Sequence, residues 1–267
     1  MRVSEPAPTS VLGTSLAEQV EQLMSTVDRT IVADDSMFAG NEEHYFTVAS
    51  DALGAVLHAL HGAGSEPPRR VLDFGCGYGR VLRTLRAAFG DAELIACDLD
   101  PAAVDNCVRA FGARGLAAST DPDLIEQVDD VDLIWCGSVV THLDAPQWTP
   151  LLRYFARALR PGGTAVLTTH GRRVAWRMSA LPDADYGLTD AVARQVLTCY
   201  RATGFGYADY PHQDGYGISL SSPGWAVGKA LETPGLRLVG YQEAAWDRHQ
   251  DVLVLRKDAD LVLKATR

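Results

Sequence analysis

The stretch VLDFGCGYGRVLRTL, residues 71–85, passes through three kinds of pattern within one short segment. Val71–Phe74 form a mostly apolar run, which predicts a short buried strand. Residues 75–79 alternate glycine with other side chains, which predicts a tight turn. The apolar residues of 81–85 then recur at helical spacing. The stretch therefore predicts a strand, a glycine-rich loop and a helix, an arrangement typical of nucleotide-type sites.

The chain has 267 residues, of which 47% are hydrophobic and 22% charged, as expected for one large α/β domain or a domain with an insertion. The formal net charge is −10, and the only lysines are Lys229, Lys257 and Lys264. Because no lysine-rich face is available to follow phosphates, we expect no nucleic-acid partner. The five cysteines form no C-x-x-C pair, which disfavours a zinc site or a disulfide framework.

The beginning of the chain, residues 1–12, lacks the long apolar segment and cleavage site of a secretory signal. No segment elsewhere approaches the ~18 apolar residues that a membrane-spanning helix needs. We therefore expect no membrane span and a cytoplasmic location.

Short apolar segments and helical patterns alternate along the chain. Two helical patterns, at 15–30 and 42–61, come first, and strands are expected at 71–75, 94–98, 116–118, 131–136 and 164–169. This alternation predicts a parallel sheet with helices on both faces. The fifth strand follows a helix expected at 149–159 and a turn at 161–163. Two final strands, at 237–243 and 251–255, are joined too closely for a crossover helix and should form an antiparallel pair.

Two acidic residues flank the glycine loop in a way that indicates its ligand. Asp98 ends the second strand, 21 residues after Gly77, where a carboxylate can accept both ribose hydroxyls. Asp73 lies two residues before the first glycine, where it would repel a diphosphate and suit an ammonium or sulfonium. The loop also reads G-x-G-x-G rather than the G-x-G-x-x-G of dinucleotide sites, which disfavours an NAD-dependent oxidoreductase. The alternative for Asp73 is a structural turn acid.

Four segments, in order, resemble the successive motifs of the class I S-adenosylmethionine-dependent methyltransferases. They are VLDFGCGYGR (71–80), LIACDLDPAAV (94–104), VDLIWCGSVVTHL (131–143) and LLRYFARALRPGGTAVLTTHG (151–171). The resemblance implies S-adenosylmethionine as cofactor and a Rossmann-like α/β fold, with a seven-stranded, mostly parallel sheet whose last strand is antiparallel. We expect residues 1–66 to form a tail and helical cap, and 67–267 the methyltransferase domain. Residues 171–235, rich in aromatics and without a clean period, would be an acceptor-binding lid.

The resemblance also implies roles for single residues. Asp73, Gly75 and Gly77 would contact the methionine moiety, Asp98 the ribose and Leu99 the adenine. Ser119 would flank the adenine edge, and Cys136 and Gly137 would line the pocket near the methyl donor. Tyr45 would close the donor site, as an N-terminal aromatic often does in this family; the alternative is that Tyr45 is a core residue of its helix.

An acceptor hydroxyl would need a base or a metal, since an un-ionised hydroxyl is a poor nucleophile. His142, after the fourth strand, is the candidate base; the alternative is a packing or helix-start residue. Asp144 could orient His142, bind a divalent cation such as Mg²⁺, or cap the next helix. His170 and the WDRHQD segment (246–251) could converge on the same edge, but their scattered spacing is only a weak metal signal.

The segments TTHG, GFGYADY, YGISLSS and HQDVLVL together resemble a methyltransferase subgroup linked to bacterial glycan and glycolipid assembly, such as mycobacterial methylmannose polysaccharide synthesis. This resemblance implies methyl transfer to a hydroxyl of a carbohydrate or glycoconjugate. Aromatic and polar side chains in the insertion suit sugars. The alternatives are an aromatic or other small natural-product acceptor, and a non-catalytic cofactor-binding or partner-binding module. The N-terminal helices leave a homodimer open.

Overall fold

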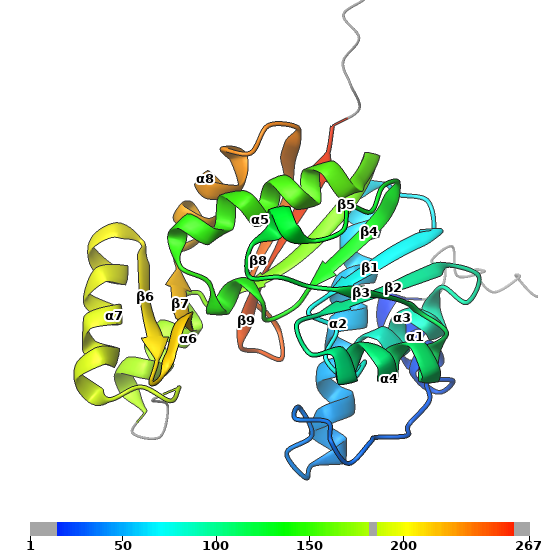
Figure 1. Cartoon of the computed structure of the whole chain (residues 1–267), viewed down its shortest axis with the longest axis horizontal. Helices are drawn as coiled ribbons and strands as arrows, with labels where there is room; N and C mark the ends of the chain where they lie inside the picture. Colours follow the sequence, from blue (N-terminus) through cyan, green and yellow to red (C-terminus); the bar gives the residue numbers. More distant parts are fainter. Residues whose placement is uncertain (1–14, 182–185, 259–267) are drawn as a thin grey trace, which may run out of the picture.

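The central element of the fold is a seven-stranded sheet in the order β3-β2-β1-β4-β5-β9-β8 (Figure 1). The computed structural model describes residues 15–181 and 186–258. The strands are β1 (Arg70–Phe74), β2 (Glu93–Asp98), β3 (Arg114–Ala117), β4 (Val131–Cys136), β5 (Leu159–Thr169), β8 (Leu236–Trp246) and β9 (Gln250–Lys257). Strands β1 to β5 pair in parallel, and β9 is antiparallel to both β5 and β8. The predicted Rossmann-like α/β sheet with an antiparallel last strand is confirmed.

Helices cover both faces of this sheet (Figure 1). One face packs against α2 (Glu42–Ala63), α3 (Leu82–Ala88) and α4 (Pro101–Phe111), and the other against α5 (Ala145–Ala158) and α8 (Pro223–Leu231). Helix α1 (Leu16–Met24) packs on α2 and α3. Neighbouring strand residues alternate between the two cores, because side chains of a strand point to opposite faces: Val71 and Trp135 lie in one, Leu72 and Cys136 in the other.

The ends of the N-terminal helices are fixed by local signals. Helix α2 begins after Asn41, whose side chain accepts a hydrogen bond from the His44 backbone N–H, and ends at Gly64 in the left-handed conformation, with φ +60°. The helix expected at 42–61 is thus confirmed. The helix expected at 15–30 is shorter than predicted, because α1 ends at Met24.

The junction of α5 and β5 differs from the prediction. Helix α5 begins at Ala145, earlier than residue 149, because Asp144 and Gln147 form a capping box and proline is tolerated in a first turn. Residues 161–163 were expected to form a turn, yet they lie within β5, which begins at Leu159. An irregular register opposite 131–133 and the positive φ of Gly162, +80°, accommodate them as a bulge-like start of the strand.

The segment after β5 is ordered into α6 (Arg172–Ala180), α7 (Asp190–Thr203), β6 (Phe205–Tyr210), β7 (Gln213–Ser221) and then α8. Strands β6 and β7 form a separate antiparallel pair beyond the edge of the main sheet, and α6 and α7 lie beside this pair (Figure 1). A small apolar cluster that includes Val174, Val196 and Ile218 holds them together. Strand β7 also contacts the 3₁₀ turn η2 (Val140–His142), which brings the segment against the carboxyl edge of the main sheet.

Candidate functional site

A cavity of about 390 Å³ opens at the carboxyl ends of β1, β2 and β4. Its wall combines the glycine loop, the residues after β2 and β4, two residues of the N-terminal segment and the start of β7. Ligands of open parallel sheets bind in such crevices, because loops after adjacent strands diverge there. We call this cavity the donor crevice.

The glycine loop is held against β2 and can be built only with glycine at two of its positions. The backbone N–H groups of Gly75 and Cys76 both donate to the Cys97 carbonyl, at 2.8 and 3.1 Å. Gly75 has φ +83°, and a Cβ there would lie 2.3 Å from Val139 Cγ2. Gly79 has φ +89°, and a Cβ there would lie 2.3 Å from Phe111 Cε2. The loop backbone therefore borders the crevice directly, where a side chain would otherwise stand.

Asp98 is positioned by the loop that it faces. Its Oδ2 accepts from the Gly77 backbone N–H at 2.8 Å, and its Oδ1 accepts from the Asp100 N–H at 3.0 Å. An ionised carboxylate has about four acceptor sites, so two remain for a diol. Leu99, 57% exposed, and Ser119 also line the crevice.

Asp73 is a buried carboxyl without a partner. It is 1% exposed, lines the crevice, and neither of its oxygens accepts a hydrogen bond. Burial, with a smaller contribution from the charge of Asp98, raises the pKa of Asp73 to about 8. A structural turn acid would accept backbone hydrogen bonds, whereas Asp73 accepts none. This disfavours the interpretation of Asp73 as a turn acid.

The N-terminal segment covers one end of the crevice through Ser36 and Met37. Tyr45 lies behind this cover and does not line the crevice: its hydroxyl donates to Asp35 Oδ2 at 2.6 Å in a buried contact. Arg83 donates to the backbone carbonyls of residues 28, 30 and 79, at 2.8, 2.9 and 3.2 Å. Arg83 thus connects the N-terminal segment to Gly79, the last glycine of the loop. Tyr45 is a core residue of that segment.

His142 lines the crevice at the end of η2. Its Nδ1 lies 2.8 Å from the Gly217 carbonyl, which can only accept, so Nδ1 carries the proton and Nε2 of the neutral ring keeps its lone pair. Burial lowers the pKa of His142, and the Gly217 carbonyl partly opposes this effect. The ring of Tyr216 stacks on His142 at 4.8 Å between centroids, with 23° between planes.

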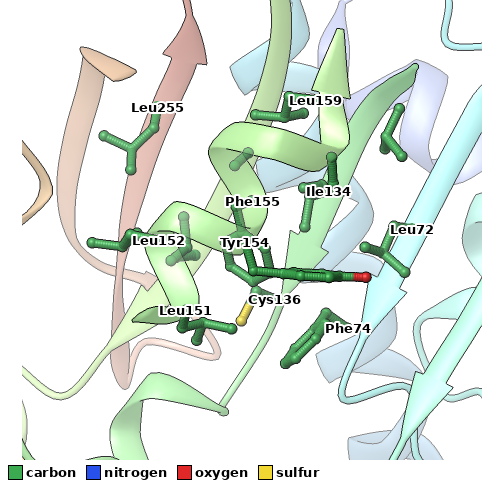
Figure 2. Packing of buried hydrophobic residues seen from close by; sticks show 14 of the residues in the cluster. Leu72, Phe74, Ile134, Cys136, Leu151, Leu152, Tyr154, Phe155, Leu159 and Leu255 are labelled. Carbon is green, nitrogen blue, oxygen red and sulfur yellow. The ribbon is translucent and has the colours of Figure 1, made fainter. Parts of the chain in front are cut away.

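Besides Tyr45, two predicted site residues lie outside the crevice. Asp144 caps α5, with its carboxylate accepting from the Ala145 N–H at 2.7 Å, and it does not line the crevice. Cys136 faces the opposite core, where Figure 2 shows it among residues of α5 and β1, so the prediction that it lines the pocket is wrong. Strand alternation explains the error, because Trp135 and Gly137 line the crevice on either side of it.

Several lining residues had no predicted role, among them Met37, Arg80 and Trp246, whereas Tyr216 lies in the segment expected as the acceptor-binding lid. All except Arg80 lie far from the glycine loop in sequence, so no local spacing links them to it. Arg80 follows the last glycine directly, and its position in the loop was an available signal.

The polar residues near the last strand are mostly occupied. Gln250 accepts from the Thr168 hydroxyl at 2.6 Å and donates to the Ser138 hydroxyl at 3.0 Å. Asp251 accepts from the Tyr241 hydroxyl at 2.6 Å. Across residues 15–181 and 186–258, no group of three or more His, Cys, Asp or Glu side chains could hold a metal ion. No helix in the same ranges is long and apolar enough to cross a membrane.

Comparison with known proteins agrees with this geometry. The sequence pattern of a family described as a methyltransferase domain matches residues 71–163. A ubiquinone biosynthesis O-methyltransferase of Xanthomonas oryzae pv. oryzae is 33% identical over 126 residues, or 44% of this chain and 49% of that protein. A carboxy-S-adenosyl-L-methionine synthase of Sodalis glossinidius is 27% identical over 122 residues, with shares of 43% and 49%. The chain thus spans about half the length of the curated relatives it matches.

Among solved structures, a S-adenosylmethionine-dependent methyltransferase from Clostridium acetobutylicum superposes with a TM-score of 0.55 at 13% identity. The superposition covers 79% of this chain and 92% of that one, and at this identity it shows a common fold. The sequence match thus identifies residues 71–163 as a methyltransferase domain, and the seven-stranded fold is shared with this S-adenosylmethionine-dependent methyltransferase.

Proposed function

We propose that this protein transfers a methyl group from S-adenosylmethionine to a hydroxyl of a carbohydrate or glycoconjugate, with His142 as the general base. The observation that carries the proposal is the 2.8 Å contact of His142 Nδ1 with the Gly217 carbonyl, which leaves Nε2 free at the wall of the donor crevice. The lowered pKa of His142 keeps the ring neutral near pH 7, so it can accept a proton.

The crevice residues fit the cofactor. The unpartnered carboxyl of Asp73 would bind the methionine ammonium, the loop backbone at Gly75 and Gly77 would lie against the methionine chain, and the two free acceptor sites of Asp98 would bind the ribose hydroxyls. Leu99 and Ser119 would border the adenine. Bound S-adenosylmethionine supplies an electrophilic methyl group on a sulfonium.

The residues of this chain would then align the acceptor and remove its proton. Nε2 of His142 takes the hydroxyl proton as the acceptor oxygen gains the methyl group, and the imidazolium afterwards returns that proton to solvent. Gly217 stabilises the imidazolium, because its carbonyl accepts from Nδ1 in both states. A positioned base of this kind contributes about 10²- to 10⁴-fold in rate.

The acceptor class is inferred from the wall beside His142. The ring of Tyr216 is partly exposed there, and the side chains of Gln147 and Asp214 add polar groups. Sugars are bound by an aromatic face together with such polar groups. A flat aromatic acceptor would use the Tyr216 ring alone, whereas a sugar would also use the Asp214 carboxylate.

The test is a methyl-transfer assay with labelled S-adenosylmethionine on a panel of monosaccharides, oligosaccharides and catechols. We expect sugars to be methylated and His142→Gln to lower kcat by about 10²- to 10⁴-fold while the affinity for S-adenosylhomocysteine is kept. His61→Gln, at an exposed position on α2, is the matched control and should leave kcat unchanged. Methylation of catechols alone would overturn the sugar assignment. Unchanged kcat in His142→Gln would overturn the base, and failure to bind S-adenosylhomocysteine would overturn the whole proposal.

A further inference from the structure

A second group of polar side chains lies at the carboxyl edge of the sheet, outside the donor crevice. It consists of His170 after β5, Arg177 on α6, Tyr186 before α7 and His249 between β8 and β9. The rings of His170, Tyr186 and His249 lie 5.4 to 5.9 Å from one another, and Tyr186 stacks on His249 with 21° between planes. We call these four residues the edge cluster.

The edge cluster contains buried donors without partners. His170 Nδ1, Tyr186 Oη and Arg177 Nε are each inaccessible to solvent and have no hydrogen-bond partner among residues 15–181 and 186–258. The whole His170 side chain is also buried, with 5% of the residue exposed. A guanidinium Nε–H can only donate, and a phenol and a neutral imidazole each offer one donor. Because buried polar groups are normally paired, these three atoms indicate a missing acceptor.

The charges around the edge cluster favour an anion as that acceptor. Arg177 and Arg173 both lower the pKa of His249, after burial, and the one acid that opposes them there is Asp247. Arg172, the neighbour on α6, is occupied by Glu243 at 2.6 Å, whereas the ion pairs among the described residues include none for Arg177. Among the described residues, Arg177 is therefore a cation without an ion-pair partner beside two rings whose polar atoms are buried, an arrangement in which a carboxylate or phosphate oxygen would form charge-assisted hydrogen bonds.

The edge cluster is adjacent to the catalytic wall of the donor crevice. His142 contacts β7 at Gly217, and the backbone of His170 contacts the same strand at Ser221. The two contacts on β7 are four residues apart. A molecule with its hydroxyl at His142 can therefore reach the cluster.

From these contacts we propose that the edge cluster binds an anionic group, carboxylate or phosphate, on the methyl acceptor, which would make the substrate an acidic sugar or glycoconjugate. This inference rests on the proposed function for the identity of the acceptor. Arg177 and Tyr186 would donate to the anion directly, while His249 would hold the Tyr186 ring in place by stacking.

The test measures anion binding alone, so that it does not depend on the acceptor or on the cofactor. The probes are acetate, inorganic phosphate and, as the neutral counterpart of acetate, acetamide, titrated into the full chain while NMR follows the imidazole resonances of His170 and His249. We expect saturable shifts with acetate or phosphate and none with acetamide. The tighter of the two anions identifies the carboxylate or the phosphate as the natural group.

Variants assign the effect to the edge cluster. Arg177→Gln should weaken anion binding at least about tenfold, and Tyr186→Phe, which removes only the hydroxyl, should also weaken it if Arg177→Gln fails to fold. Arg172→Gln, on the same helix but paired with Glu243, is the control and should bind as the parent does. Equal shifts with acetamide, the absence of saturable shifts with both anions, or full affinity in Arg177→Gln and Tyr186→Phe would each overturn the inference. Binding of S-adenosylhomocysteine, measured separately, reports on the proposed function instead.

Discussion

Cofactor binding should release a proton from Asp73. With its pKa raised to about 8, this carboxyl is protonated in the free protein at pH 7, to about nine-tenths by the titration equation. An ammonium group placed against it favours the ionised form and lowers its pKa. Binding of S-adenosylhomocysteine at pH 7 should therefore release about 0.9 proton from Asp73, and almost none at pH 9.5, where the free carboxyl is already ionised.

Isothermal titration in buffers of different ionisation enthalpy, such as phosphate and Tris, measures this number. The slope of the observed enthalpy against buffer enthalpy gives the protons exchanged per ligand. Asp73→Asn removes the titrating group, and subtracting its slope also removes the contribution of the ligand's own amine. Equal slopes for the parent and Asp73→Asn at pH 7 would refute the assignment of Asp73 to the ammonium.

The same raised pKa also sets the sign of a stability effect. Folded Asp73 holds its proton up to about pH 8, whereas the unfolded carboxyl loses it near 3.8, so this group favours folding fully below pH 3.8 and progressively less as pH rises towards 8. Asp73→Asn has no carboxyl at this position, so its stability does not fall with rising pH for this reason. Its advantage in free energy of unfolding should grow by about 1.4 kcal/mol per pH unit between pH 5 and 7 and reach about 4 kcal/mol at pH 7. Urea denaturation at several pH values tests this, and a pH-independent difference would contradict it.

Three further changes probe the crevice. Gly79→Ala forces a Cβ against the Phe111 ring at positive φ and should destabilise by about 2–4 kcal/mol in urea melts, whereas Gly90→Ala, with open space, should not. Asp98→Asn should weaken S-adenosylhomocysteine binding by about 1.5–3 kcal/mol in titration calorimetry, because charge-assisted bonds to the ribose are lost. An unchanged binding free energy would contradict this. Arg83→Met removes the side-chain bonds to the carbonyls of residues 28 and 30, while the Gly79 carbonyl keeps the backbone N–H of residue 83, and should cost about 1–3 kcal/mol of stability; a variant as stable as the parent would disprove the tie.

The sheet and the glycine loop were predictable because their signals are local. A strand, a glycine turn and a helix follow one another within residues 71–85, and the right-handed crossover rule then fixes where the next parallel strand lies. For the same reason Asp98 was placed correctly: it ends β2, and the Gly77 N–H that it accepts belongs to the loop after the neighbouring strand. Local pattern and topology together determine this half of the site.

The acceptor half could not be predicted, because its contacts join distant segments. The partner of His142 is Gly217, 75 residues away on a strand whose own sequence shows no clean period. The choice between Trp135 and Cys136 depends on which face of β4 the crevice opens, and the amino-acid types do not reveal this. Asp144 was open to three interpretations until the capping contact with Ala145 decided among them.

The two halves of the site have unpaired buried groups of opposite kind, and this difference can direct each reactant to its own half. The donor crevice holds Asp73, a buried acceptor without a donor, and the edge cluster holds Arg177 and Tyr186, buried donors without an acceptor. Strand β7 connects the two halves, because Gly217 contacts His142 at the crevice wall and Ser221 contacts the backbone of His170. A cationic ligand in the edge cluster would leave its donors unpaired and lie against the charge of Arg177, and an anionic ligand beside Asp73 would meet like-charge repulsion once this carboxyl is ionised, above about pH 8. Specificity on this argument comes from exclusion as well as from attraction, and above about pH 8 Asp73→Asn should therefore admit anions to the donor crevice that the parent protein rejects.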